Sequence, residues 1–202
     1  MRYPPKHHQE NNQAHLEAII SKYGLGTLIS THANQVYTSH LPVILSTCKT
    51  KLLTHIDAAN PQNNTLTNGK NVTVIFNGPE AYISPATYAS KQLPTWNYIR
   101  VHIKGNITEI TNPNKVKESL VALSKHFEPP KSNALISLDD PRLNPLLPYI
   151  KSYAIKITSW EGKFKLSQDK SMEDQLLALQ ALLQNTPENS QEFIRQLCDP
   201  KK

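Results

Sequence analysis

The chain has 202 residues, of which 38% are hydrophobic, and 22 Lys and Arg against 16 Asp and Glu residues give a formal charge of +6. This length suits one domain, or one domain with a small helical appendage, and the hydrophobic content suffices for a buried core. The charge is compatible with phosphate-bearing partners, but the basic residues are scattered as singles and pairs, which argues against a nucleic-acid patch on this chain alone.

The cysteines and the N-terminal segment indicate a cellular compartment. Cys48 and Cys198 are far apart in the sequence and lie in no CxxC motif, which argues against a disulfide scaffold or a cysteine-rich zinc site and suits a reducing cytosol. The segment MRYPPKHHQENN lacks the apolar core of a signal peptide, and the chain has no apolar run of the roughly 18 residues that a membrane helix requires. We therefore expect a soluble, cytoplasmic protein without membrane association.

The first half of the chain begins with a predicted helix and continues with a predicted hairpin. Apolar residues recur at helical spacing over residues 11–24, where Asn11 or Asn12 can cap the helix and Gly24 ends it. The period then changes to two, which predicts strands over residues 26–32 and 36–46 around a turn at Ala33-Asn34-Gln35.

The rest of the chain predicts more strands, then helices. Stretches rich in β-branched and aromatic residues, bounded by Asn, Gly or Pro, predict strands at 51–56, 71–78, 80–84, 97–110 and 149–167. Helices are predicted at 112–128, from Ser171 onward with Met172, Leu176, Leu179 and Leu183 on one side, and at 187–198.

Strands that are mostly close in sequence predict an antiparallel sheet, and a sheet of this size tends to close into a barrel. The expected fold is therefore mainly β with flanking helices (α+β). We expect one barrel domain over residues 1–170 and a helical appendage, packed on the barrel, over residues 171–202.

Polar and aromatic residues gather in four clusters at strand ends: Tyr37–Pro42, Thr54–Gln62, Phe76–Tyr88 together with Pro94–Tyr98, and Glu161–Asp169. They supply amides (Asn60, Gln62, Asn97, Gln168), hydroxyls (Thr38, Ser39, Ser84, Ser167), cations (Lys163, Lys165) and rings (Tyr82, Tyr88, Trp96, Tyr98). This set suits a flat heteroaromatic ligand with a phosphate tail. The alternative is that the rings fill a barrel mouth and that the Asn-Pro and Gly-Pro pairs only form turns.

The sequence lacks the motifs of several common catalytic and nucleotide-binding sites. The chain has no GxGxxG or GxxxxGK phosphate loop, no GxSxG nucleophile elbow and no HExxH metal motif. We expect no metal site, and the sequence identifies no catalytic residue.

The motifs RYPPKH, SHLP, HIDAANPQ, VIFNGPEAYISP, LPTWNYIRVHIKG and EGKFKLSQDK, in this order, closely resemble the PaiB-type family of FMN-binding negative transcriptional regulators. The resemblance runs from Tyr3 to about Asp174. It implies an antiparallel FMN-binding split β-barrel, related to the pyridoxamine-phosphate oxidase group, that forms a homodimer with FMN at the subunit interface. The cofactor-binding residues that it implies are Thr38, Ser39, His40, Leu41, Pro42, His55, Asn60, Gln62, Trp96, Asn97, Tyr98, Lys163, Lys165, Ser167 and Gln168.

This sequence departs from the family pattern at several positions. His8 stands where an aromatic residue is usual, Thr87 where a tryptophan is expected, and Asp169 where the family has Asn. Asp57-Ala58 replaces Ala-Arg in the segment where split barrels commonly hold the FMN phosphate. Because a guanidinium binds phosphate through paired hydrogen bonds, we expect an FMN affinity about ten- to a hundred-fold below that of an arginine-bearing relative.

Three functions follow as hypotheses. The first is a PaiB-like transcriptional regulator that binds FMN, with DNA contacted through the dimer. The second is a flavin-dependent oxidoreductase of the pyridoxamine-phosphate oxidase-like group. The third is a haem-binding split barrel, with one of His32, His40, His55, His102 or His126 as the axial ligand.

Overall fold

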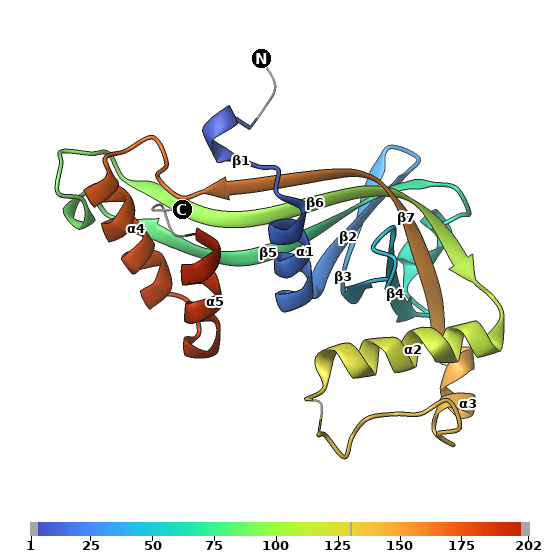
Figure 1. Cartoon of the computed structure of the whole chain (residues 1–202). Helices are drawn as coiled ribbons and strands as arrows, with labels where there is room; N and C mark the ends of the chain where they lie inside the picture. The colour runs from blue at the N-terminus through green and yellow to red at the C-terminus, as the bar shows by residue number, and fades with distance from the viewer. Residues whose placement is uncertain (1–3, 130, 199–202) are drawn as a thin grey trace. The chain divides into compact units, whose positions relative to one another are not determined.

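The structure, a computed structural model, describes residues 4–129 and 131–198 (Figure 1). The described residues contain seven strands: β1 (Gln9–Glu10), β2 (Leu25–His32), β3 (Gln35–Leu45), β4 (Lys51–Asp57), β5 (Asn71–Ile83), β6 (Thr95–Ile110) and β7 (Ile150–Lys165). The α-helices are α1 (Gln13–Lys22), α2 (Pro113–Phe127), α3 (Leu143–Leu146), α4 (Met172–Gln184) and α5 (Glu188–Cys198). Short 3-10 helices are η1 (Lys6–His8), η2 (Pro61–Thr65), η3 (Pro85–Thr87) and η4 (Leu147–Tyr149).

The local sequence signals predict most of these elements. Asn12 caps α1, since its Oδ1 accepts a hydrogen bond from Ala14 N at 3.0 Å. Ala33 and Asn34 have φ angles of 47° and 60°, the left-handed conformation that a two-residue hairpin turn requires. The strands predicted at 71–78 and 80–84 are one strand, β5. Gly78 lies inside it, and a Cβ there would lie 3.0 Å from Ile99 Cβ, so this position needs glycine for close packing.

The chain forms two compact units. The described residues of unit 1 are 4–16, 77–101 and 161–198, and those of unit 2 are 17–76 and 102–160 without residue 130. The ends of the predicted domains, residues 1–3 and 199–202, lie outside the described residues.

Unit 2 contains a closed ring of antiparallel strands. The strand order is β7-β4-β3-β2-β5-β6, and a further pairing of β6 with β7 closes the ring. Leu28 of β2 lies opposite Ser39 of β3, and Leu52 of β4 lies opposite Ile155 of β7. Leu28, Leu52 and Ile155 are buried, as alternation along each strand requires. The predicted antiparallel, mainly β fold with flanking helices is confirmed.

Helix α2 covers β3 and β4 in unit 2. Its buried residues Val116, Leu120 and Val121 form a cluster with Leu143 of α3. The sequence did not predict α3, because it lies in a proline-rich connector where helical periodicity is interrupted.

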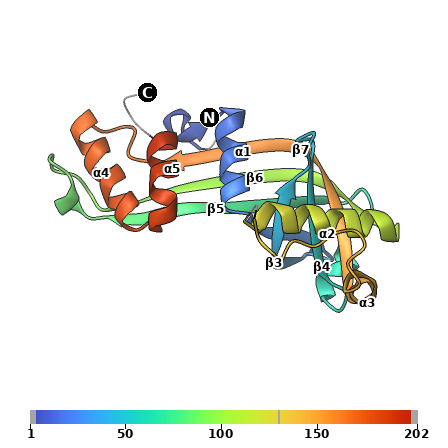
Figure 2. The ribbon, with the colours of Figure 1, turned by 60° about the horizontal axis from the view of Figure 1, so that its bottom comes forward.

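Unit 1 combines β1, the parts of β5, β6 and β7 within this unit, and the helices α4 and α5, which lie side by side (Figures 1 and 2). Strand β1 pairs with β7, with Gln9 opposite Lys163. The predicted apolar side of α4 is only partly buried, since Met172 and Leu176 are 48% and 36% exposed. No helix in the described part of the chain is both long and apolar enough to cross a membrane.

Candidate functional site

The residues that the sequence assigns to the cofactor divide between the two units. Unit 2 contains Thr38, Ser39, His40, Leu41, Pro42, His55, Asn60 and Gln62, and unit 1 contains Trp96, Asn97, Tyr98, Lys163, Lys165, Ser167 and Gln168.

The β3 residues alternate between the barrel interior and the surface. Leu41 is buried, whereas Thr38 and His40 are exposed. His40 Nδ1 lies 3.0 Å from Thr27 Oγ1 on β2, and Ser39 Oγ accepts a hydrogen bond from Asn60 Nδ2 at 3.0 Å. Two of the predicted residues, Ser39 and Asn60, are therefore brought together.

The turn after β4, residues 57–63, satisfies its own backbone. Ala58 N donates to Tyr149 O at 2.9 Å, and Asn60 N donates to Asp57 O at 3.0 Å. Asp57 Oδ1 accepts from Ala59 N at 2.7 Å, and Asn60 Oδ1 accepts from Gln62 N at 2.9 Å. These amides already have acceptors, so a phosphate at this turn would have to be held by side chains.

Gln62 joins this turn to the barrel. Its side chain is 1% exposed, and Nε2 lies within hydrogen-bond distance of Leu28 O, Ser30 Oγ and Tyr37 O, at 3.2, 2.9 and 3.1 Å. Because Nε2 is surrounded by acceptors of β2 and β3, this amide is committed to the fold of the barrel.

His55 has a different environment. It lies on β4 directly opposite Ser152 of β7, and His55 Nδ1 and Ser152 Oγ are both buried without a hydrogen-bond partner among the described residues. Burial lowers the pKa of His55 below its usual value of 6.5, so the imidazole is neutral at pH 7. Buried polar atoms without partners are uncommon, and this pair offers hydrogen bonds to a ligand. No sequence motif marks Ser152, because only the strand register brings it opposite His55.

The motif at the start of β6 places its aromatic side chains differently. Trp96 is 53% exposed and packs edge-to-face against Tyr82 of β5, with ring centroids 6.0 Å apart. The Tyr98 ring lies beside two cations, with Arg100 Cζ at 5.5 Å and Lys163 Nζ at 5.2 Å from its centroid. Such cation–π contacts hold the Tyr98 ring in place.

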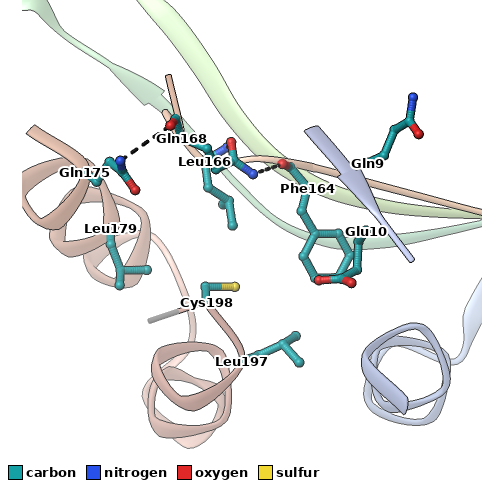
Figure 3. A pocket seen from close by; sticks show the side chains of 9 residues that line it. All are labelled: Gln9, Glu10, Phe164, Leu166, Gln168, Gln175, Leu179, Leu197 and Cys198. Carbon is teal, nitrogen blue, oxygen red and sulfur yellow. Dashed lines mark hydrogen bonds between the residues drawn. The ribbon is translucent and has the colours of Figure 1, made fainter. Parts of the chain in front are cut away.

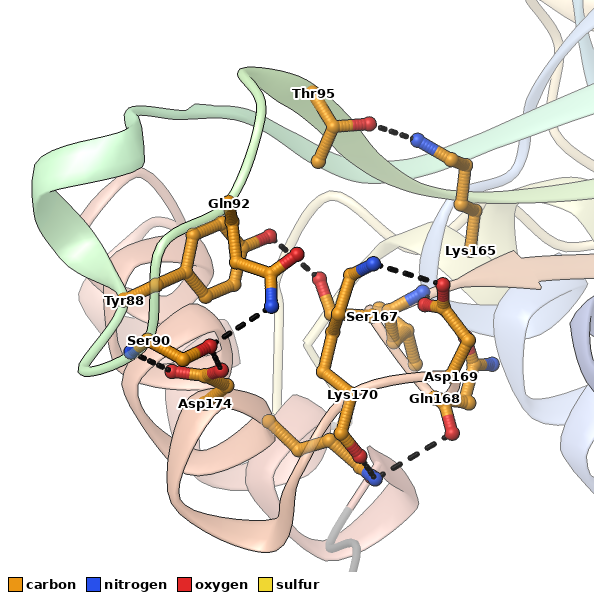
Figure 4. A network of polar contacts seen from close by, with 12 residues as sticks. Tyr88, Ser90, Gln92, Thr95, Lys165, Ser167, Gln168, Asp169, Lys170 and Asp174 are labelled. Carbon is orange, nitrogen blue, oxygen red and sulfur yellow. Dashed lines mark hydrogen bonds and ion pairs between the residues drawn. The ribbon is translucent and has the colours of Figure 1, made fainter.

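Asn97, between Trp96 and Tyr98 in the sequence, is buried, with 1% exposure. Its Oδ1 accepts a hydrogen bond from Ser167 Oγ at 3.2 Å, and Ser167 Oγ lies 2.8 Å from Tyr88 OH (Figure 4). A chain in which Tyr88 donates to Ser167 and Ser167 donates to Asn97 satisfies these three groups. Asn97 Nδ2 then has no acceptor among the described residues.

Lys165 binds the start of β6, and Gln168 binds its own loop after β7. Lys165 Nζ donates to Thr95 Oγ1 and, at 2.7 Å, to Trp96 O. Gln168 Oε1 accepts from Leu166 N at 2.8 Å, while Gln168 Nε2 donates to Phe164 O (Figure 3). Gln168 therefore shapes the loop after β7.

A small cavity of about 180 Å³ beside Gln168 is lined partly by residues of α4 and α5 (Figure 3). Cys198 lines it, and burial followed by the charge of Glu10 raises the pKa of this thiol to about 12. A thiol that is protonated at pH 7 is a poor nucleophile. Within residues 4–129 and 131–198, no group of three or more His, Cys, Asp or Glu side chains could hold a metal ion.

Comparison with known proteins identifies the family. The family described as "Putative FMN-binding domain" matches residues 2–159, and the chain belongs to this family. Protease synthase and sporulation protein PAI 2 of Bacillus subtilis (strain 168) is 26% identical over 204 residues, which cover 99% of this chain and 98% of that protein.

Two solved structures are similar in fold. The FAD and heme binding protein from Mycobacterium smegmatis has a TM-score of 0.65 and 16% identity, with 85% of this chain and 80% of that chain covered. The flavocytochrome Anf3 from Azotobacter vinelandii has a TM-score of 0.61 and 12% identity, with 78% and 69% covered. The predicted split-barrel fold and the predicted family are confirmed.

Proposed function

We propose that this member of the FMN-binding family binds FMN and acts as a homodimeric transcriptional regulator of the PaiB type in the cytoplasm. The observation that carries the proposal is the similarity to PAI 2 along nearly the whole chain, together with the family match over residues 2–159. The name of that relative links it to protease synthesis and sporulation, which is compatible with a role in gene control.

The polar groups of unit 2 fit part of a flavin mononucleotide. His55 Nδ1 and Ser152 Oγ are buried without partners, and a flavin offers ring and ribityl acceptors and donors that would satisfy them. FMN, when bound, supplies a redox-active isoalloxazine ring, and the protein's part is to bind and orient it.

The phosphate is the less well matched part of FMN. Ala58 supplies no guanidinium, and the amides of the 57–63 turn are already bonded within the structure. Lys51, on the same face of β4 as His55, is the cation on that strand that could bind the phosphate. A flexible ammonium is a point charge without the paired geometry of arginine, so moderate affinity is expected.

The proposed dimer rests on exposed apolar side chains of unit 1. Leu93, Trp96 and Tyr82 are 83%, 53% and 52% exposed. A two-fold axis would bury the same patch from each subunit, and large aromatic residues commonly anchor such contacts.

The absorption spectrum of the purified protein, before and after addition of FMN, tests the cofactor. We expect a flavin envelope, whereas a Soret band would indicate haem and contradict the proposal. An electrophoretic mobility shift with DNA from the protein's own operon, with and without FMN, tests the regulator. Rapid bleaching of the flavin by NADH or NADPH, with no DNA shift, would instead support the oxidoreductase.

A further inference from the structure

A second cavity of unit 1, of about 250 Å³, lies at the start of β6. Backbone and side chains from three segments of unit 1 line it: His8, Gln92, Leu93, Pro94, Thr95, Asn97, Lys165, Ser167, Asp169 and Lys170. It is too small for a whole flavin and suits a small molecule or one group of a larger ligand.

Asn97, a buried residue that lines this cavity, has a hydrogen-bond donor without an acceptor among the described residues. In the arrangement in which Tyr88 donates to Ser167, Ser167 donates to Asn97 Oδ1. Asn97 Nδ2 has no acceptor among the described residues, and water cannot easily supply one, because Asn97 is only 1% exposed. A buried amide donor without an acceptor is unfavourable, and a ligand oxygen would satisfy it.

The charges around Asn97 favour an anion. Lys165 and Lys170 line the cavity, and Asp169, the carboxylate among the lining residues, lies 2.9 Å from Lys170 Nζ (Figure 4). His8 lines the same cavity, and its pKa falls from 6.5 to about 4, first through burial and then through neighbouring charges that include Lys165. The neutral imidazole adds no charge at pH 7, so the lining side chains carry one carboxylate and two ammonium groups. The Lys165 ammonium group also donates to Thr95 Oγ1 and Trp96 O.

We infer that this cavity is an oxyanion site, in which Asn97 Nδ2 and the ammonium groups of Lys165 and Lys170 bind a carboxylate or phosphate group. The site shares Asn97, Lys165 and Ser167 with the residues proposed for the flavin, so it deepens the proposed function. Its probes are inorganic phosphate and acetate, which contain no flavin, and loss of flavin binding would therefore leave the test intact.

The experiment is a titration of the full-length, ¹⁵N-labelled protein with sodium phosphate or sodium acetate, at an ionic strength held constant with sodium chloride. The observable is the side-chain NH₂ signal of Asn97. We expect saturable shifts of this signal. Signals that stay in place, or that move linearly with salt, would overturn the inference.

Three variants test which charged side chains affect anion binding. Lys170→Gln should weaken binding about three- to ten-fold, because it removes a cation that lines the cavity and donates to Asp169 at 2.9 Å. Asp169→Asn should tighten binding by a similar factor, because it removes the competing carboxylate and releases Lys170. Lys91→Gln is the matched control, since it removes an equal charge from an exposed residue outside the cavity. Equal weakening by Lys91→Gln and Lys170→Gln would show non-specific screening and overturn the inference.

Competition between inorganic phosphate and FMN shows whether the oxyanion is the phosphate of the cofactor or belongs to a second ligand. If FMN displaces inorganic phosphate from the Asn97 signal and riboflavin does not, the site binds the phosphate of the cofactor. If phosphate and FMN bind together, the site serves a second, acidic ligand. Both results support the oxyanion site, and the spectrum described above tests the flavin independently.

Discussion

The turn at residues 57–63 in unit 2 and the loop after β7 in unit 1 both carry polar motifs that the family resemblance assigns to a cofactor, but they use their polar groups differently. In the turn, Asp57, Asn60 and Gln62 are bonded to the backbone or to the barrel. In the loop, hydrogen bonds fix Ser167 and leave Asn97 Nδ2 with no acceptor.

This difference shows that a polar residue in a family motif need not contact the ligand. The NH₂ group of Gln62 is bonded to the barrel and contributes to stability, although Gln62 Oε1 has no partner among the described residues. The NH₂ group of Asn97 has no acceptor there and is available to a ligand. Substitutions in each region test this difference.

The largest effect is expected at Gln62. Gln62→Leu leaves three buried or half-buried acceptors without their donor, so the free energy of unfolding should fall by about 2–4 kcal/mol, as measured by urea denaturation. The neighbouring Asn64 is exposed, so Asn64→Leu should change the free energy of unfolding by less than about 0.5 kcal/mol. Equal losses in both variants would show that the turn, and not the Gln62 amide, determines stability.

The second effect concerns the phosphate. Asp57→Asn combined with Ala58→Arg supplies a guanidinium and removes a negative charge, while the asparagine oxygen still accepts the hydrogen bond from Ala59 N. We expect FMN to bind about ten- to a hundred-fold more tightly in a flavin-fluorescence titration. Asp57→Asn alone is the control and should give less than half of this gain in free energy. An unchanged affinity in the double variant would remove the 57–63 turn from the phosphate site.

The third effect concerns association. Trp96→Ala removes a half-exposed ring that contacts Tyr82, so sedimentation should show a dimer dissociation constant raised about ten-fold or more. The melting temperature of the monomer should change little. A large drop in melting temperature with dimerisation intact would identify Trp96 as a core residue instead.

The smallest effect is a pH dependence at His8. Its folded pKa of about 4 lies below the unfolded value of 6.5, so the unfolded state binds the proton more tightly, and stability is lost as the pH falls from about 6.5 to 4. The causes are burial and the charges of His7, Lys165 and Lys163, while the charge of Asp169 opposes the shift. Because His8 is partly exposed and solvent screens these charges, His8→Gln should remove less than about 1 kcal/mol of this loss. A His8→Gln stability curve parallel to the wild type from pH 7 to 4 would contradict the shift.

Local patterns predict the fold well where they are strong. The hairpin of β2 and β3 and the helices α1, α2, α4 and α5 follow from alternation, helical periodicity and caps. Strand β1 and helix α3 were missed, because a two-residue strand has no period and prolines interrupt the connector.

The sequence predicts the candidate site less completely than it predicts the fold. The motifs mark Gln62 and Asn97 alike as amides, and only the acceptors around them separate the two. Gln62 meets Leu28 and Tyr37, which lie on other strands, and Ser152 comes opposite His55 through the pairing of β4 with β7. Such contacts depend on strand register, which a single sequence does not specify.

Equilibrium dialysis of the wild-type protein against FMN, with riboflavin as the comparison, tests flavin binding most directly. We expect saturation near one FMN per chain and weaker retention of riboflavin, which lacks the phosphate. FMN that distributes equally across the membrane, at every concentration up to about 1 mM, corresponding to a binding free energy weaker than about −4 kcal/mol, would contradict the account.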